Sequence, residues 1–285
     1  MAKHPPRAIP TINLPSREPI PVLGMGTWGM GEHRNRRQEE IKAILTGISL
    51  GMTLIDTAEM YGGGATEELI GQALLGRRDE VFLVSKVLPE NATTRGTIEA
   101  CERSLRRLNT DRIDLYLLHW RGSVSLEKTI DAFERLAADG KIRYWGVSNF
   151  DVEDMEELLD LREGTKCQTN QVLYNPGRRG IEHDLLPWCI DRHIPVMAYT
   201  PIEQGRLLNH SALRKTAARH GVSPAQVALA WVLRNENVMT IPKASTLEHL
   251  VENREAVKVT LTREDLAELD KAFPPPARKI PLELL

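Results

Sequence analysis

The sequence predicts a (β/α)8 TIM barrel, in which eight parallel strands alternate with helices and a small N-terminal β-hairpin closes the bottom. Short apolar runs alternate with amphipathic, helix-like stretches throughout the 285 residues. The runs are almost continuously apolar, which is typical of strands buried on both faces of a parallel sheet. Eight such units suit a closed barrel in a chain of this length, and a doubly wound open sheet is the alternative.

The elements follow in a regular order. Residues 8–23 alternate apolar and polar side chains around Ser16, Arg17 and Glu18, which predicts the hairpin. Strands are predicted at 21–26, 53–56, 81–86, 113–119, 142–148, 167–171, 195–200 and 238–243. The clearest helices are predicted at 37–51, 94–108 and 125–140, where apolar residues recur at helical spacing. No linker or low-complexity stretch divides the chain, so we expect residues 1–285 to form a single domain.

Composition narrows the function classes. The 37 basic and 39 acidic residues are interspersed, so nothing indicates binding to nucleic acid or to a membrane surface. Three widely spaced cysteines suit reduced thiols in the cytoplasm, and the proline-rich N-terminus does not resemble a signal peptide. No run reaches the length of a membrane span, and no cluster has metal-ligand spacing. We expect a cytoplasmic monomer or weak oligomer that binds a small molecule and no metal.

Polar residues end the predicted strands. Asp56, Lys86 and His119 close the second, third and fourth runs, and Tyr61 follows Asp56 in a glycine-rich stretch. Each residue alone has a structural explanation, such as a helix cap or a satisfied core histidine. In a parallel barrel, however, the carboxyl ends of the strands meet at one face. Four ionisable groups at that face indicate an active site.

These four residue types indicate proton transfer. A tyrosine donates a proton well near neutral pH only if its pKa of about 10 is lowered, and a neighbouring ammonium such as Lys86 does this. Asp56 would hold Lys86, while His119 would orient a carbonyl oxygen or relay the proton. Tyr61 is therefore predicted to be the general acid of a carbonyl reduction. Because no side chain supplies a hydride, a nicotinamide cofactor is implied.

The sequence resembles the aldo-keto reductase superfamily from Ile12 to about Phe273, and is most like the compact bacterial reductases of methylglyoxal and other small aldehydes. The matching segments occur in order as GMGTW (24–28), GMTLIDTAEMYGGG (51–64), VFLVSK (81–86), DLYLLHW (114–120), GVSNF (146–150), TNQVLYN (169–175), AYTPI (198–202) and IPKASTLEHLVEN (241–253). The resemblance implies that Asp56, Tyr61, Lys86 and His119 form the catalytic tetrad. It also implies NADPH as the cofactor, with weaker binding of NADH possible.

The resemblance places the cofactor along the ends of the strands. The implied contacts are Gly26, Thr27, Trp28, Ser148, Asn149, Gln171, Tyr199, Pro201, Gly205, Leu207, Lys243, Thr246, His249, Glu252 and Asn253. Gly24 and Gly26 would allow close approach of the backbone, and Tyr199 would stack on the nicotinamide ring. Residues 201–207 would lie against the pyrophosphate, while Glu252 and Asn253 would contact the adenine. Trp28 and Trp120 would line an open substrate pocket.

One departure from the family pattern concerns the 2′-phosphate of NADPH. Many NADP-dependent members have a serine and an arginine where this chain has Ala244 and His249. Lys243 and Thr246 remain, but a bidentate, permanently charged guanidinium is missing from this segment. Two other functions are alternatives: a cofactor-binding regulatory module like the potassium-channel β subunits, and an unrelated barrel enzyme acting on phosphorylated substrates.

Overall fold

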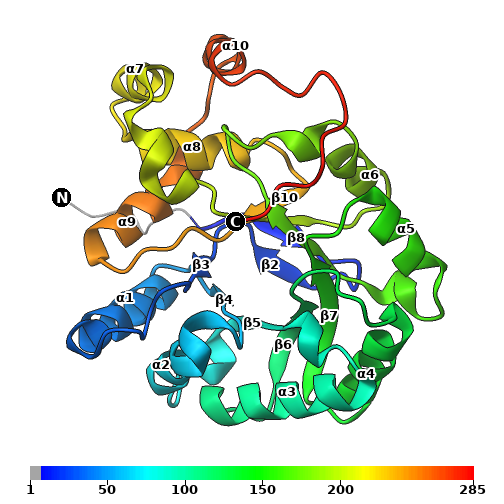
Figure 1. Cartoon of the computed structure of the whole chain (residues 1–285). Coiled ribbons are helices and arrows are strands. Elements are labelled where there is room, and N and C mark those ends of the chain that lie inside the picture. Colours follow the sequence, from blue (N-terminus) through cyan, green and yellow to red (C-terminus); the bar gives the residue numbers. More distant parts are fainter. Residues whose placement is uncertain (1–7) are drawn as a thin grey trace.

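The computed structural model describes residues 8–285 and forms a closed (β/α)8 barrel, as predicted (Figure 1). Eight strands lie side by side in sequence order, and all neighbouring strands are parallel. The barrel strands are β3 (Met25–Gly26), β4 (Leu54–Asp56), β5 (Phe82–Val87), β6 (Ile113–Leu118), β7 (Ile142–Ser148), β8 (Asn170–Leu173), β9 (Val196–Tyr199) and β10 (Val238–Thr240). Bridges from Leu23 to Thr240 and from Gly26 to Lys243 close the sheet. This closure excludes the open, doubly wound alternative.

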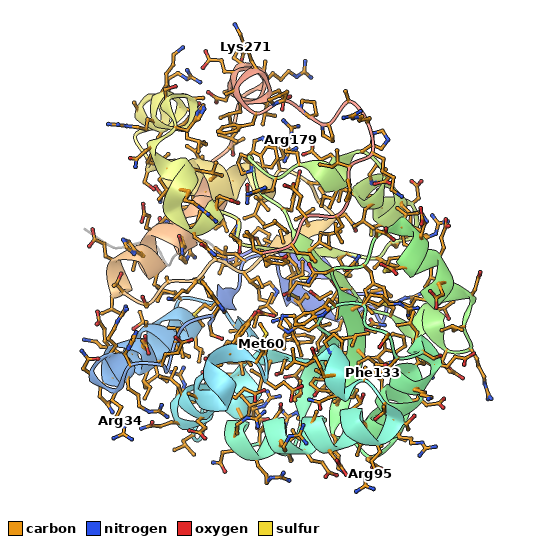
Figure 2. All side chains as sticks on the ribbon, viewed as in Figure 1. Arg34, Met60, Arg95, Phe133, Arg179 and Lys271 are labelled. Atoms are coloured by element: carbon orange, nitrogen blue, oxygen red, sulfur yellow. The ribbon has the colours of Figure 1, made fainter. Side chains whose placement is uncertain are left out.

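Helices surround the sheet as an outer ring (Figure 1). They are α1 (Arg37–Ser49), α2 (Ala65–Ala73), α3 (Thr94–Leu108), α4 (Leu126–Ala138), α5 (Val152–Asp160), α6 (Leu185–Asp191), α7 (Ser211–His220), α8 (Pro224–Val232), α9 (Leu247–Glu255) and α10 (Arg263–Ala272). Three of them begin with reciprocal capping boxes, which satisfy the first backbone N–H groups: α5, α8 and α10. In Figure 2, Phe133 of α4 lies on the inner side of the ring, whereas Arg95 and Lys271 project from its outer edge.

The core has two parts, because successive strand residues point to opposite faces of the sheet. The larger part fills the space between the strands and the helices. The smaller part fills the barrel interior and contains Leu54, Val84, Leu117 and Met197 among others. The interior is therefore packed with side chains, as a barrel of eight strands requires. Chemistry is then restricted to the ends of the barrel.

The predicted hairpin is present and closes the amino-terminal end of the barrel. Its strands, β1 (Thr11–Asn13) and β2 (Pro19–Pro21), pair in an antiparallel register. Leu14 and Ile20 are buried and belong to the interior cluster. The hairpin thereby removes the lower end of that cluster from solvent.

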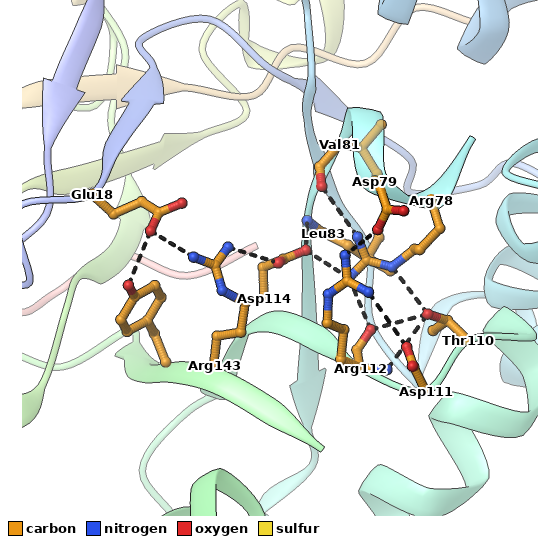
Figure 3. Close-up of polar contacts among 11 residues, drawn as sticks. Glu18, Arg78, Asp79, Val81, Leu83, Thr110, Asp111, Arg112, Asp114 and Arg143 are labelled. Atoms are coloured by element: carbon orange, nitrogen blue, oxygen red, sulfur yellow. Dashed lines mark hydrogen bonds and ion pairs between the residues drawn. The ribbon is translucent and has the colours of Figure 1, made fainter. Parts of the chain in front are cut away.

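An ion-pair network ties the hairpin to the strands at this end (Figure 3). Buried Asp114, at the start of β6, accepts from Arg78 Nη2 at 2.6 Å and from Arg143 Nη1 at 3.0 Å. Arg143 Nη2 donates in turn to Glu18 Oε2 of the hairpin at 2.6 Å, and the Tyr144 hydroxyl donates to the same oxygen at 3.0 Å. The network lies opposite the carboxyl ends of the strands, so its role is structural.

The C-terminal segment after α10 runs back over the barrel and ends at its centre (Figure 1). Arg178 Nη1 donates to Glu283 Oε1 at 2.5 Å, and Lys279 Nζ donates to Glu153 Oε1 at 3.1 Å. The segment is short, but it reaches the carboxyl-terminal mouth of the barrel, where the sequence predicts an open substrate pocket. Within residues 8–285, no helix is long and apolar enough to cross a membrane.

Candidate active site

Lys86 is the centre of the polar cluster at the carboxyl ends of the strands. Its side chain is fully buried near the end of β5. The ammonium donates to Asp56 Oδ2 at 2.8 Å, to the Thr57 carbonyl oxygen at 2.8 Å and to the Tyr61 hydroxyl oxygen at 3.2 Å. All three ammonium protons are therefore used. The structure brings together the acid, the amine and the phenol that the sequence indicates.

The segment between β4 and α2 explains the position of Tyr61. Asp56 is the last residue of β4, and the chain then turns through η2 (Tyr61–Gly64) into α2. Gly62, Gly63 and Gly64 have φ angles of 56°, 62° and 100°, a left-handed conformation that strongly favours glycine. Before the glycines, the Tyr61 backbone N–H donates to the Ala58 carbonyl oxygen at 3.1 Å, and this turn lets a tyrosine only five residues after Asp56 place its hydroxyl on the same ammonium.

Gln171 holds the second oxygen of Asp56, which the sequence reasoning did not anticipate. Its Nε2 donates to Asp56 Oδ1 at 2.8 Å, while its backbone carbonyl accepts from Ser148 Oγ at 2.8 Å. Gln171 lies within β8 instead of closing it, since the strand continues to Leu173. Both carboxylate oxygens of Asp56 are thus fixed, which fixes the direction in which Asp56 presents its charge to Lys86.

Burial and charge act in opposite directions on the two proton-carrying groups. Burial would lower the pKa of Lys86, but Asp56 and Tyr61 outweigh it and the pKa is raised. Burial raises the pKa of Tyr61; Lys86 opposes this increase and Asp56 adds to it. The expected lowering by Lys86 is present, yet the net shift of the Tyr61 pKa is upward because a buried phenolate loses its hydration. In the free protein, Tyr61 therefore carries its proton at neutral pH.

His119 follows β6 and faces Tyr61, with 6.0 Å between their ring centroids. Burial, together with the charge of Lys86, lowers the pKa of His119 to about 3. Its imidazole is therefore neutral at physiological pH. His119 Nδ1 is buried and has no hydrogen-bond partner within the part of the chain that the structure describes. A neutral ring with an unused polar atom is suited to contacting a polar group of a bound molecule.

The residues predicted for the nicotinamide end lie next to this cluster. The Tyr199 hydroxyl donates to Asn149 Oδ1 at 3.0 Å, and Asn149 Nδ2 donates to the His119 carbonyl at 3.0 Å. Burial raises the pKa of Tyr199 to about 12, and the backbone of Leu285 opposes this shift. That contact places the end of the chain beside Tyr199. The Thr27 hydroxyl donates to the Asp56 carbonyl at 2.8 Å, so its oxygen remains available as an acceptor.

The predicted pyrophosphate segment has a constrained backbone. Pro201 is buried, and Gly205 and Leu207 lie in η7 (Glu203–Asn209). Gln204 and Gly205 have positive φ angles of 54° and 87°. Asn175 Nδ2 donates to buried Glu203 Oε2 at 2.8 Å and holds the segment against the strands. The segment is thus folded and anchored beside the mouth.

The far end of the predicted cofactor site is formed by the loop from β10 to α9. Lys243 and His249 are exposed, and Thr246 caps α9 by accepting from the His249 backbone N–H at 3.3 Å. Glu252 is partly buried and Asn253 is buried in α9. The structure also brings Arg36 to this loop, a residue that the sequence reasoning missed because it lies more than two hundred positions earlier.

The two predicted pocket tryptophans differ in exposure. Trp28 follows β3 and is 55% exposed. Trp120 is partly buried, and its ring centroid lies 4.8 Å from that of His119. Trp120 can therefore form an apolar wall beside the polar cluster, whereas Trp28 stands at the rim. Among the residues from 8 onward, no group of three or more His, Cys, Asp or Glu side chains could hold a metal ion.

Comparisons with known proteins show which family this chain resembles in sequence and fold. The methylglyoxal reductase YeaE of Escherichia coli (strain K12) is 53% identical over 271 residues, which cover 93% of this chain and 95% of that protein. A glyoxal reductase of Bacillus subtilis (strain 168) is 37% identical, covering 91% of each chain. The crystal structure of an aldo/keto reductase from Klebsiella pneumoniae in complex with NADP and acetate has a TM-score of 0.95 and 50% identity, covering 98% of this chain and 100% of that chain. The family model of the aldo/keto reductases matches residues 22–273, and the chain therefore belongs to the aldo/keto reductase family.

Proposed function

We propose that this protein reduces small aldehydes and ketones such as methylglyoxal to alcohols with NADPH, and that Tyr61 is its general acid. The observation that carries the proposal is the position of the Lys86 ammonium, fully buried between Asp56 Oδ2 at 2.8 Å and the Tyr61 hydroxyl at 3.2 Å. The methylglyoxal and glyoxal reductases among the relatives support the substrate class. The NADP complex of the structural relative supports the cofactor.

The donor set of this chain fits a nicotinamide dinucleotide. Amide and hydroxyl groups of Ser148 and Asn149 lie at one end, and the charge of Lys243 lies at the other. Between them, a Cβ atom on Gly26 would lie 2.5 Å from the Ile241 carbonyl oxygen, so the backbone there tolerates no side chain. An amide-rich end, a bare backbone and a cationic end are the features that such a cofactor requires. NADPH supplies a hydride when it is bound.

In the mechanism that we propose, the Tyr61 hydroxyl gives its proton to the carbonyl oxygen of the substrate as the carbonyl carbon gains the hydride. The phenolate left on Tyr61 is stabilised by the ammonium of Lys86, which Asp56 holds in place. Neutral His119 donates a hydrogen bond to the same carbonyl oxygen and orients it, while a proton from solvent restores Tyr61. Because His119 is neutral at physiological pH, we assign it the orienting role and leave proton donation to Tyr61.

The contacts within the cluster favour an enzyme over the regulatory alternative. A module that only binds cofactor has no need of a buried amine that contacts both an acid and a phenol. Taking such a charge out of water costs free energy even when it is paired, so the arrangement is expected where it contributes to chemistry. We therefore retain the reductase as the single proposed function.

We also propose that residues 1–285 form one domain that acts in the cytoplasm as a monomer or weak oligomer. All three cysteines, Cys101, Cys167 and Cys189, are buried and unpaired, which suits a reducing compartment. The eight-stranded sheet spans the chain from β3 to β10, and the C-terminal segment returns to its mouth. Gel filtration with light scattering would test the oligomeric state.

The proposed activity is tested by mixing the protein with NADPH and methylglyoxal and following the absorbance of the reduced nicotinamide. We expect a protein-dependent loss of absorbance, faster with NADPH than with NADH, and an alcohol product identifiable by NMR. Reactions without protein and without aldehyde are the controls. If methylglyoxal, glyoxal and other small carbonyl compounds all leave NADPH unoxidised, the proposed function is wrong.

A further inference from the structure

A contact between distant parts of the chain lies at the cationic end of the proposed cofactor site. Arg36 belongs to η1 (Arg34–Arg36), the short helix between β3 and α1. Its Nη2 donates to Ser245 Oγ at 2.9 Å, although the two residues are 209 positions apart. Ser245 lies between Lys243 and Thr246, two residues that the family resemblance associates with the 2′-phosphate of NADPH. The contact therefore brings a guanidinium to the segment from which the usual arginine is missing.

A buried carboxylate also lies near this guanidinium. Arg36 Nε lies 4.0 Å from Glu40 Oε1, one helical turn later in α1. Glu40 is only 1% exposed, and its Oε2 accepts from the Gly31 backbone N–H at 2.9 Å. Arg36 itself is 40% exposed. Within residues 8–285, Ser245 and Glu40 are the only partners of its guanidinium, so other N–H donors of that group remain available to a ligand.

Arg36 and Lys243 form a pair of neighbouring positive charges. Partial desolvation lowers the pKa of Lys243, and the charge of Arg36 lowers it further, whereas Glu40 and Glu32 act in the opposite direction. The Lys243 ammonium also lies over the backbone at Gly29, because a Cβ atom there would lie 3.5 Å from Nζ. Two like charges that act on each other in this way repel, and an anion that binds to both relieves that repulsion.

We propose that Arg36 completes the 2′-phosphate site and determines the preference for NADPH over NADH, in place of the arginine that the family pattern has at His249. The guanidinium provides a planar set of charged donors, which suits phosphate oxygens better than an ammonium does. Ser245 orients it, and Lys243 adds a second charge beside it. The loops after the last two barrel strands often form phosphate sites, which agrees with this location. This inference rests on the proposed function, in which NADPH is the cofactor.

A purely structural role for Arg36 predicts different behaviour. In that case Arg36 would only link η1 to the loop before α9. Its removal would then weaken the binding of NADPH and NADH equally, or would change the binding of neither. A phosphate-reading residue affects only ligands that carry the 2′-phosphate. The comparison of NADPH with NADH therefore distinguishes the two roles, since the two cofactors differ only in that phosphate.

The test is to measure the dissociation constants of NADPH and NADH by quenching of tryptophan fluorescence in the wild type and in Arg36→Met. Loss of a charge-assisted contact is expected to raise the dissociation constant of NADPH by about tenfold or more. Binding of NADH should not change. By calorimetry, adenosine 2′-monophosphate should lose affinity in the variant, whereas adenosine 5′-monophosphate should bind equally to both proteins. The weakening should also diminish at high salt, because salt screens the charge of the exposed guanidinium in the wild type.

Arg37→Met is the matched control, because Arg37 is adjacent in sequence but its Nε donates to Gln72 Oε1 of α2, away from Ser245. It should bind both cofactors like the wild type. Arg36→Lys keeps the charge but loses the planar donors, so its affinity for NADPH should be intermediate. Thermal melting checks that each variant is folded. Adding His249→Arg to Arg36→Met should restore part of the affinity for NADPH.

Two results would overturn the assignment. One is an unchanged dissociation constant for NADPH in folded Arg36→Met, and the other is an equal loss for NADPH and NADH. Either result leaves the proposed reductase function intact, provided that the wild type binds NADPH and reduces aldehydes. If the wild type binds neither cofactor, the proposed function itself has failed. The two failures are therefore distinguishable.

Discussion

Replacing Lys86 by methionine should strongly destabilise the fold. Methionine fills a similar volume but leaves the Asp56 carboxylate without its counterion in a site where the Asp56 side chain is only 3% exposed and that of Lys86 is 0% exposed. Removing one member of a buried ion pair costs about 3 to 5 kcal/mol, because the remaining charge is neither hydrated nor paired. The Thr57 carbonyl oxygen also loses its donor. For a protein of this size, each kcal/mol corresponds to roughly 2 to 4 °C in Tm, so a large shift is expected.

The double variant Asp56→Asn/Lys86→Met separates stability from chemistry. It removes the unpaired charge, and the new amide side chain still offers Gln171 an oxygen acceptor in place of the Asp56 carboxylate. We expect the double variant to regain most of the free energy of unfolding that Lys86→Met loses. It should not regain activity, since no ammonium remains to stabilise the Tyr61 phenolate.

Denaturant and thermal unfolding of the wild type, the single variant and the double variant provide the assay. If Lys86→Met is as stable as the wild type, the reasoning is refuted, because the ion pair contributes nothing to stability. If the double variant is as unstable as Lys86→Met, the reasoning is also refuted, because the loss of stability arises from packing and not from an unpaired charge. Full reductase activity in either variant would remove Lys86 from the proposed chemistry.

Two further predictions concern histidines. His249→Arg should widen the preference for NADPH over NADH by up to about tenfold, because it adds charged donors at the exposed start of α9. Fluorescence titration of both cofactors measures this preference. An unchanged ratio of the two dissociation constants would show that position 249 does not reach the phosphate. The pKa of His119 is lowered from 6.5 to about 3, so between these values the unfolded chain binds a proton that the folded protein does not. The free energy of unfolding should therefore fall as the pH decreases through this range, by at most about 1.4 kcal/mol per pH unit from this group. His119→Asn should show a shallower fall in acid unfolding experiments, and an identical slope would contradict the lowered pKa.

The barrel could be predicted from the sequence because each strand is a nearly continuous apolar run. Residues 81–86, for example, predict β5 (Phe82–Val87) to within a single position at each end. The clustering of Asp56, Lys86 and His119 could be predicted because these residues lie at or next to the carboxyl ends of consecutive strands, and parallel strands bring such positions together. The alternation of apolar runs with helical segments thus predicts the barrel, and the alignment of parallel strands predicts where these polar side chains meet.

Other features depend on tertiary contacts that no local pattern encodes. Gln171 and Asp56 are 115 positions apart, and nothing in either segment indicates that an amide would hold the carboxylate. Arg36 lies in a run of arginines that resembles an ordinary solvated surface. The net direction of the Tyr61 pKa depends on how completely the phenol is buried, which the sequence does not reveal. The sequence also does not reveal that the C-terminal segment reaches Tyr199.

The most direct test of the central claim is the rate of NADPH oxidation by methylglyoxal in Tyr61→Phe, measured alongside the dissociation constant for NADPH. The substitution removes the hydroxyl that contacts Lys86 and leaves the ring. The variant should bind NADPH like the wild type and lose roughly 10²- to 10⁴-fold in kcat, the usual contribution of general acid catalysis. A variant that binds NADPH normally and turns over methylglyoxal at close to the wild-type rate would contradict the assignment of Tyr61 as the proton donor.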